Sequence, residues 1–263
     1  MSGIICTHNG GFFSCCSVKL YEIVNFINMH RREPETVDSS QQFEWYKNTP
    51  GDITFVYFEH YQDKDMLKNN RDLIKYHHDD QFRPFADLDY NHLVPIVAKY
   101  FSPSLKIQSL IQKMEQKYSL DYDNLCVLFY RGNDKGRETQ LCIYEEYLQY
   151  ANLILEKNRQ ISFLIQTDET EFLDFMSRNY PDNSFYFRDE IRHMSRCNNT
   201  VDKVFSNQNY DFSQNYLAIT VIMSRCKYII CNSGNCSIWI MFYRGNNDNV
   251  YQNLDGQWFF DIV

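Results

Sequence analysis

A dense cluster of charged residues follows the apolar stretch that ends at Tyr130 and reads RGNDKGRE. An arginine offers a planar fork of donors that matches phosphate oxygens, and a lysine adds a compact positive charge. A neighbouring carboxylate could remove a proton from a hydroxyl group. The candidate catalytic residues are therefore Arg131, Asp134, Lys135 and Glu138. The alternative is an ordinary solvated loop, which the strongly apolar segment directly before it disfavours.

A second loop, NSGNCS, follows the apolar segment KYII and leads into a predicted helix. Small residues at this point allow backbone N–H groups to approach an anion at the helix N-terminus. The alternative is an ordinary helix cap, because serine and asparagine favour that position in any case, and the sequence leaves both interpretations open. The predicted anion contacts are Ser233, Gly234, Asn235 and Ser237.

Two more predicted strands end on polar or small residues. Asp168 and Glu169 follow one of them, although acidic residues also suit the first turn of the helix that comes next. Gly10 and Gly11 follow the first strand, where a simple turn is the alternative. Ligands of doubly wound sheets bind outside the carboxyl ends of the strands. Four polar strand ends together therefore predict one ligand site.

Hydrophobic periodicity predicts an α/β protein with mostly parallel sheets covered on both faces. We expect a division near residue 102, between an N-terminal lobe (1–101) and a C-terminal lobe (102–263). In the first lobe we expect strands at 3–7 and 35–40, a helix at 17–32 and a β-rich run at 50–58, with little structure assigned to 61–92. In the second we expect strands at 124–131, 161–167, 184–187 and 227–232, and helices at 102–120, 144–158, 169–179, 212–225 and 236–244.

Bulk properties exclude several classes of protein. The net charge is −8 with no long basic run, so a nucleic-acid surface is not expected. Nine irregularly spaced cysteines without a CxxC pair argue against a zinc site or a disulfide framework, and favour buried thiols. His77 and His78 fit an exposed loop better than a metal site. No apolar stretch approaches 18 residues, and we expect no membrane span, no signal peptide and a cytoplasmic location.

Three segments resemble one family of enzymes, the core α1,6-fucosyltransferases and their bacterial relatives in nodulation-factor synthesis. YRGNDKGRETQLCIYEEYL is similar to their arginine motif, roughly R-x-x-D-K-(x)-G-x-E. FLIQTDETEFLDFMSRNYPDNSFYF resembles their next strand and helix, and IMSRCKYIICNSGNCSIWI resembles their closing segment. The N-terminal GGFFSCCSVKLYEIVNFINMHRR resembles the family's opening loop and helix more faintly. The resemblance runs from about residue 100 to residue 245.

The resemblance implies a GT-B-like fold of two Rossmann-like lobes, with the nucleotide sugar in the C-terminal lobe. It implies inverting transfer from GDP-fucose to a glycan hydroxyl group, without a metal ion or another cofactor. Arg131 would hold the β-phosphate, Asp134 and Lys135 match the motif, and Glu138 lies one position from the catalytic glutamate. By the same comparison Asp168 and Glu169 match an acidic pair, and residues 233–237 the phosphate-contacting loop.

The sequence departs from the family pattern at several positions, among them residues 17–19 of the N-terminal loop. Gly132 stands where the family has a second arginine, and Ile219 stands where it has an acidic residue that helps to read guanine. These departures keep a second hypothesis open, an inactive GT-B-fold protein that binds carbohydrate or has a structural role. A third is an unrelated nucleotide-binding α/β enzyme such as a phosphotransferase, which the absence of a P-loop lysine motif disfavours. The expected absence of an anchor suggests assembly of a glycan in the cytosol, as in bacteria or a large DNA virus, and the composition suits an AT-rich genome.

Overall fold

The computed structural model describes residues 3–61 and 72–260. In the N-terminal half, β1 (Gly3–Ile5) and β2 (Thr36–Asp38) pair in parallel across α1 (Phe12–His30). The chain then forms mostly short helices, and α3 is the longest of them. These are the 3₁₀ helix η1 (Glu44–Tyr46), α2 (Thr54–Tyr57), η2 (His78–Phe82), η3 (Phe85–Asp87) and α3 (Tyr90–Tyr100).

The C-terminal half contains a six-stranded sheet in the order β5-β4-β3-β6-β7-β8, parallel except for β8 at one edge. Its strands are β3 (Leu125–Tyr130), β4 (Ser162–Thr167), β5 (Ser184–Phe185), β6 (Tyr228–Asn232), β7 (Val250–Leu254) and β8 (Gln257–Phe260). Its helices are α4 (Leu105–Tyr118), η4 (Tyr122–Asn124), η5 (Asn133–Arg137), α5 (Tyr144–Lys157), α6 (Thr170–Asn179), α7 (Val201–Val204), η6 (Ser206–Gln208), α8 (Asn209–Arg225) and α9 (Asn235–Arg244).

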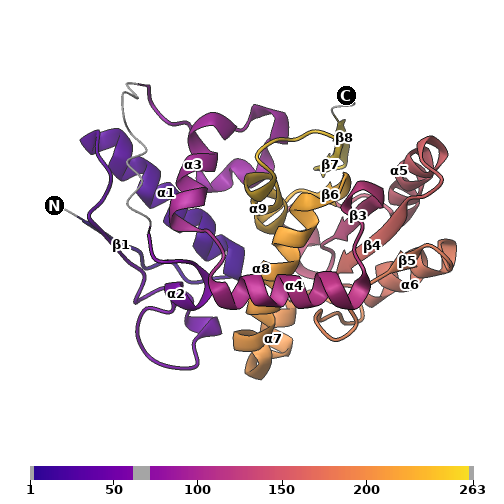
Figure 1. Ribbon diagram of the computed structural model, residues 1–263, viewed down its shortest axis with the longest axis horizontal. Coiled ribbons are helices and arrows are strands. Elements are labelled where there is room, and N and C mark those ends of the chain that lie inside the picture. The colour runs from indigo at the N-terminus through magenta and orange to yellow at the C-terminus, as the bar shows by residue number, and fades with distance from the viewer. Residues whose placement is uncertain (1–2, 62–71, 261–263) are drawn as a thin grey trace.

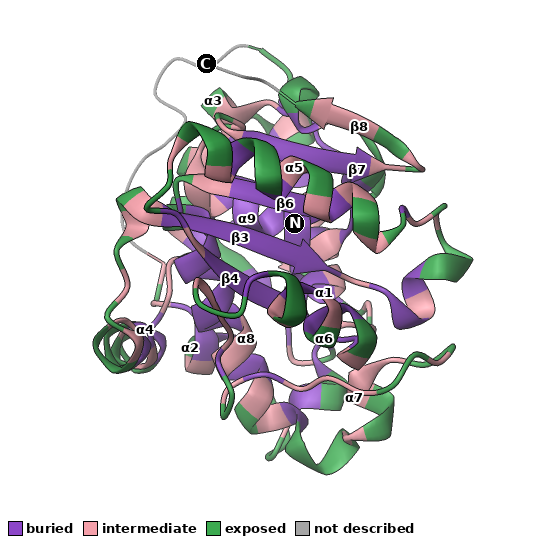
Figure 2. Ribbon diagram, turned by 90° about the vertical axis from the view of Figure 1, so that its right-hand side faces the viewer, coloured by how far each residue is buried: buried purple, intermediate pink, exposed green. Residues whose placement is uncertain are grey.

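Strand β3 is apolar throughout because the sheet is covered on both of its faces. Leu125, Val127 and Phe129 point into one hydrophobic cluster with residues of α8 and α9, and the alternate residues of β3 point into a second cluster with residues of α5 and α6. The central strands of the sheet are buried along their length (Figure 2). This two-sided burial explains the continuous apolar run that precedes Arg131.

The strand order reverses between β3 and β6. From β3 the chain moves outward through β4 and β5, and it then returns along α8 to pair β6 with the other side of β3. Because of this reversal, the loops after β3 and after β6 separate and leave a crevice at the carboxyl ends of the two strands. The loops that begin at Arg131 and Ser233 therefore face each other.

The two halves of the chain share hydrophobic contacts. Helices α8 and α9 lie between the sheet and the N-terminal elements, and α4 crosses one side of the molecule (Figure 1). Trp239 of α9 contacts the rings of Phe13 and Phe101, with centroids 6.1 Å and 4.7 Å apart. The larger hydrophobic cluster runs across residue 102, so the expected division at that residue stays a prediction.

Several predicted elements need correction. The run at 50–58 is not a strand: residues 54–57 form helix α2, whose Tyr57 packs into the buried aromatic cluster. The first strand is less buried than expected, because Ile5 is exposed. Helix α1 begins at Phe12 rather than at residue 17, and α3, β7 and β8 were not predicted. Residues 62–71 of the unassigned 61–92 segment lie outside the described residues.

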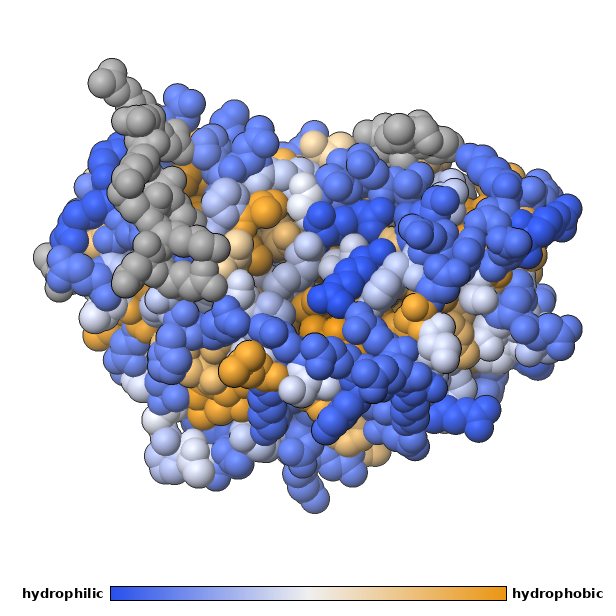
Figure 3. Space-filling view, in the orientation of Figure 1, coloured by the Kyte–Doolittle hydropathy of each residue, from blue (hydrophilic) through white to orange (hydrophobic). Residues whose placement is uncertain are grey.

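The face in Figure 3 shows hydrophobic side chains in several small patches separated by hydrophilic ones. Within residues 3–61 and 72–260, the structure contains no helix that is both long enough and apolar enough to span a bilayer.

Candidate functional site

A cleft of about 360 Å³ opens at the carboxyl ends of β3 and β6, between the two halves of the chain. The C-terminal half contributes Arg131, Asp134, Lys135, Glu138, Gly234, Asn235 and Ser237 to its lining, together with Thr200, Asp202 and Lys203. The N-terminal half contributes residues 11–14, Trp45 and Gln81. Twelve residues were predicted for the site. Seven of them lie on the C-terminal wall of the cleft, and an eighth, Gly11, lies on the N-terminal wall.

Arg131 is held in place by three side chains at the cleft wall. Its Nε donates to Asp168 at 2.8 Å, and its terminal nitrogens donate to Tyr216 and Asp134 at 3.3 Å. Burial alone would lower the pKa of Arg131, but Asp168, Tyr216 and Asp134 hold it well above its ordinary value. The guanidinium group is therefore a permanent, oriented positive charge beside the cleft.

Asn232 fixes the backbone of Arg131 across the crevice. Its Oδ1 accepts from the Arg131 N–H at 2.9 Å, and its Nδ2 donates to the Arg131 carbonyl oxygen at 2.7 Å. The last backbone pairing between β3 and β6 is Phe129 with Cys231. The asparagine side chain therefore continues the pairing of the two strands at the point where the loops diverge.

Lys135 supplies the second positive charge of this wall. It is buried, its Nζ forms an ion pair with Glu138, and it lies 5.8 Å from the centre of the Phe82 ring. A Cβ atom added at Gly234, whose φ is +159°, would lie 3.2 Å from the Lys135 side chain. A glycine at this position therefore lets the loop after β6 approach the lysine closely.

Asp134 is the candidate base with the more perturbed environment. Burial raises the pKa of its carboxyl group, and the nearby Asp168 adds to that effect, although Arg131 and Lys135 oppose it. A raised carboxyl pKa suits a group that must accept a proton near neutral pH. Glu138 also lines the cleft, but it is more exposed and is paired with Lys135.

Two helices begin at the cleft and direct backbone N–H groups toward it. Helix α1 starts after Gly11 and α9 starts after Gly234, and both glycines line the cleft. The first turns of both helices lack acidic residues, so nothing in these turns neutralises the positive ends of the helix dipoles. Asn235 in the first turn of α9 has a buried Oδ1 without a hydrogen-bond partner.

A smaller cavity of about 50 Å³ adjoins the cleft and shares Arg131, Asp202 and Tyr216 with it. Apolar residues, among them Ile219, line much of it. Gln166 at the end of β4 also lines this cavity, and its buried Oε1 has no hydrogen-bond partner. The cavity has room for a few water molecules, and its unsatisfied acceptor lies among both apolar and charged side chains.

The remaining predicted residues lie outside the lining of the cleft. Asp168 accepts from Arg131 and from the Gly132 N–H, so it orients the loop after β3. Ser233 is buried and accepts from Gln252 at 2.7 Å. Gly10 precedes the cleft-lining Gly11 and lies near His8. The predicted donor contacts of these residues stay predictions.

Glu169 lies in a separate pocket, where it is fully buried between Arg196 and Tyr144. Its side chain explains the glycine at position 132, because a Cβ atom there would lie 2.3 Å from Glu169 Oε2. The structure therefore has no room for a second arginine beside Arg131. Arg196 forms the ion pair with Glu169 from a distant part of the sequence.

Several cleft residues were missed by the sequence analysis. The cleft is lined by Trp45, Gln81, Thr200, Asp202 and Lys203, and Gln166 lines the adjoining cavity. Most belong to irregular segments without a hydrophobic period. The one available signal was for Gln166, a polar residue inside an otherwise apolar strand.

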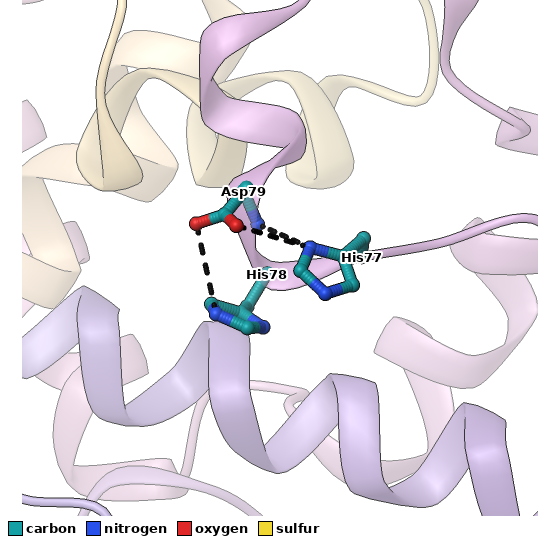
Figure 4. A group of neighbouring side chains, drawn as sticks. All are labelled: His77, His78 and Asp79. Carbon is teal, nitrogen blue, oxygen red and sulfur yellow. Dashed lines mark hydrogen bonds and ion pairs between the residues drawn. The ribbon is translucent and has the colours of Figure 1, made fainter.

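Figure 4 shows His77, His78 and Asp79, whose possible metal-ligand atoms lie within 4.8 Å of one another. His77 Nδ1 accepts from the Asp79 N–H at 3.2 Å and caps the start of η2. This capping bond occupies the nitrogen that lies nearest the Asp79 carboxylate. The three side chains are absent from the lining of the cleft, and helix capping accounts for the position of His77.

The cysteines do not provide a nucleophile for this site. Eight of the nine are buried free thiols, as predicted, and Cys197 is partly exposed. Cys236 lines the cleft, but burial raises its pKa to about 11. A thiol with this pKa is protonated at neutral pH.

The sheet order, the cleft at the strand reversal and the facing N-terminal βαβ unit define an α/β fold of the GT-B type. Comparison with solved structures gives the same class. The chain is similar to NodZ alpha-1,6-fucosyltransferase co-crystallized with GDP, with 12% identity and a TM-score of 0.53 over 97% of this chain and 96% of that one. It is also similar to the same enzyme soaked with GDP-fucose, with 12% identity and a TM-score of 0.51 over 91% of each chain.

Fucosyltransferase NodZ from Bradyrhizobium gives 11% identity and a TM-score of 0.50 over 91% of this chain and 92% of that one. No protein-family model matches the sequence. No curated protein matches it either. The predicted GT-B-like fold is confirmed.

Proposed function

We propose that this protein is a fucosyltransferase-like glycosyltransferase that moves a sugar from a nucleoside diphosphate, GDP-fucose, to a hydroxyl group of a glycan. The proposal includes inversion at the anomeric carbon, no requirement for a metal ion, and a cytoplasmic location. We do not propose nucleic acid as a partner, because the net charge of the protein is negative.

The observation that carries the proposal is the convergence of positive charge on one cleft of a GT-B fold. Arg131, Lys135 and the N-termini of α1 and α9 all face it. Fixed donors in a partly buried site stabilise a departing diphosphate strongly, because they need no reorganisation during the reaction. Such fixed donors can supply the charge that a metal ion supplies in other transferases.

The same wall supplies a base for the acceptor. In the proposed step, Asp134 takes the proton of the acceptor hydroxyl group while the hydroxyl oxygen forms a bond to the anomeric carbon. The bond between that carbon and the β-phosphate oxygen breaks, and the nucleoside diphosphate leaves with the bonding electrons. Arg131 and Lys135 stabilise the charge on the leaving group. Glu138 is the alternative base, and otherwise serves to orient Lys135.

The nucleobase is proposed to enter the smaller cavity beside Arg131. Ile219 lies in its lining at the position where the family has an acidic residue, and Gln166 provides an amide. A carboxamide offers one acceptor and one donor, which complements the N1–H and O6 of guanine. At about 50 Å³ the cavity is smaller than a base, so the proposal requires residues 190–202 to move outward when the donor binds.

Thermal-shift measurements test the donor site. GDP and GDP-fucose should raise the melting temperature of the wild type more than UDP and dTDP do, with or without EDTA. Arg131→Ala and Lys135→Ala should reduce the shift, whereas Arg137→Ala on the exposed part of the same loop should not. Lys135→Ala keeps the test informative if Arg131→Ala does not fold. Its loss should be tolerated better, since Glu138, the ion-pair partner of Lys135, is partly exposed. Absence of any nucleotide-dependent shift in the wild type would remove the main support for an enzyme.

An inactive carbohydrate-binding protein remains the second candidate, because Gly132 leaves one arginine at the phosphate site. Slow hydrolysis of the donor separates the two functions. An active transferase should hydrolyse GDP-fucose, and both Asp134→Asn and Arg131→Ala should slow this reaction. Binding of GDP without hydrolysis or transfer would favour the inactive protein.

A further inference from the structure

The wall of the cleft that faces the charged loops carries one exposed indole ring. Trp45 is 38% exposed and lines the cleft. Phe12, Phe13 and Phe129 line the same cleft but are almost completely buried. Among the residues that the structure describes, no other aromatic ring packs against Trp45, although its neighbours Phe43 and Tyr46 belong to an aromatic cluster. The ring therefore presents apolar surface to a mainly polar cleft.

The exposure of Trp45 is built into the surrounding structure. Phe43 and Tyr46, on either side of Trp45, are anchored in the core against Phe12. Phe43 has a φ of +61°, a left-handed conformation that is rare for a bulky residue. The backbone N–H of Glu44 donates to Asn9 Oδ1 at 3.0 Å. These contacts keep η1 in a turn that points Trp45 away from the core.

The same turn is tied to the opposite half of the chain. The hydroxyl group of Tyr46 donates to Asp202 Oδ2 at 2.8 Å, and the exposed Lys203 lies 5.8 Å from the centre of the Trp45 ring. A cation at this distance marks a ring face that no apolar neighbour covers. Because the lysine is long and exposed, it can move aside for a ligand on this face.

An exposed aromatic face within a polar cleft matches the chemistry of a sugar ring. A pyranose presents a patch of polarised C–H groups on one face and hydroxyl groups around its edge. The C–H patch is attracted to the negative face of an indole ring, and the hydroxyl groups need polar partners such as Gln81 and Asp134. A nucleotide diphosphate held at the charged wall would leave the Trp45 side of the cleft for the second substrate.

We infer that Trp45 is the stacking platform for the acceptor glycan, and that it positions a pyranose ring so that one hydroxyl group faces the charged wall. This inference rests on the proposed transferase function and adds the class of acceptor: a saccharide with a flat, apolar C–H face. Trp45 acts as a positioning and specificity-determining residue, and the base remains on the opposite wall.

Saccharide binding tests the inference directly by NMR, with chitotriose, cellotriose and maltotriose as probes. At least one probe should bind wild type, and its C–H protons should show upfield ring-current shifts. Trp45→Ala should weaken this binding roughly tenfold, and Trp45→Phe should retain part of it. Phe55→Ala is a matched control, because Phe55 is also 38% exposed but does not line the cleft.

The outcomes separate this inference from the proposed function. Trp45→Ala should raise the KM for the saccharide acceptor more than it changes kcat, and it should keep the wild-type thermal shift with GDP. If no probe binds wild type, or if Trp45→Ala binds a probe as well as wild type does, the platform is overturned even when GDP binding is intact. If GDP fails to bind wild type but a probe still binds through Trp45, the transferase proposal fails and the saccharide site stands.

Discussion

The C-terminal wall of the cleft is made of strand ends, whereas the N-terminal wall is made of the first turn of a helix and short 3₁₀ helices. On the C-terminal side, Arg131 and Gly234 follow neighbouring parallel strands of a six-stranded sheet. On the N-terminal side, Trp45 lies in η1 and Gln81 lies in η2, and neither belongs to the two-stranded sheet. Fixed charges are found on the first wall and an exposed aromatic ring on the second.

This difference shows that the two walls obtain their rigidity in different ways. The backbone of the sheet holds Arg131, with Asn232 extending its pairing. The N-terminal wall depends on packed aromatic side chains around Phe12, whose ring lies 4.8 to 6.4 Å from five others. Charge placement tolerates little movement, and we expect the acceptor wall to adapt more readily to a variable ligand.

The largest effect is expected at the charged wall, where Asp134→Asn should lower the rate of sugar transfer or donor hydrolysis by about 10²- to 10⁴-fold. Because burial raises the pKa of Asp134, the wild-type rate should fall on the acid side of the profile at a pH above the ordinary aspartate value. Steady-state kinetics across pH measures both effects. Glu138→Gln is the comparison, and a larger loss in that variant would move the base assignment to Glu138.

Substitutions in the aromatic cluster of the N-terminal wall should act mainly by lowering the stability of the protein. Phe12→Ala should reduce the free energy of unfolding by about 3–5 kcal/mol, because it opens a cavity at the centre of the cluster. Phe12→Leu, which fills more of the space, should lose less. Urea denaturation of both variants measures the difference. A loss below 1 kcal/mol would show that the N-terminal wall does not depend on this cluster.

The N-terminal half contains a buried lysine, which should make the stability of the protein depend on pH. Lys19 of α1 is fully buried, its Nζ donates to Thr54 at 3.1 Å, and burial lowers its pKa to about 8. Between this value and the ordinary lysine pKa, the unfolded chain binds more protons, so stability should rise with pH. Below pH 8 the full cost of the buried charge remains.

Lys19→Met should therefore stabilise the protein at pH 7 by up to about 3 kcal/mol, and the gain should shrink toward pH 10. Denaturation curves at both pH values test this, with the exposed Lys113→Met as the control. An equal effect at the two pH values would show that the pKa of Lys19 is not lowered in the folded state.

The smallest effect is expected beside Arg131. Gly132→Ala should cost about 1–3 kcal/mol of stability, since its Cβ would overlap Glu169. Gly136→Ala in the same loop should cost less, because its Cβ would make an ordinary contact with Leu141 at 3.6 Å. Thermal denaturation compares the two. Equal stability would mean that Glu169 moves freely, and that position 132 could accept an arginine.

The sheet of the C-terminal half could be predicted from the sequence because its signals are local. A continuous apolar run such as β3 followed by a charged loop indicates a buried parallel strand, and the charged loop and the loop after β6 could both be assigned to the cleft. β7 was missed because Gln252 and Asn253 interrupt its apolar pattern, and the short β8 that follows was missed with it. Gln252 can be buried because its side chain bonds Ser233 and the segment around Phe85.

The N-terminal half could be predicted only in part, because tertiary contacts override local preference there. The β-favouring residues Thr54–Tyr57 form a helix that places Tyr57 against Phe12 and Ser213. Trp45 could not be assigned to the cleft, since an exposed aromatic in an irregular segment has no periodic signal. Asp168 could be identified as important, but its contact with Arg131 depends on strand order, which local patterns do not specify.

The side chain of Asn232 stands in for a missing peptide group. Its donor and acceptor meet the backbone of Arg131 as another strand residue would, at a point where the real backbone has turned away. Aspartate has the same shape but cannot donate, and leucine can do neither. One side-chain amide thus connects the charged loop to the sheet and fixes where the loop begins. The other residues of the loop could change widely in sequence as long as this amide is kept.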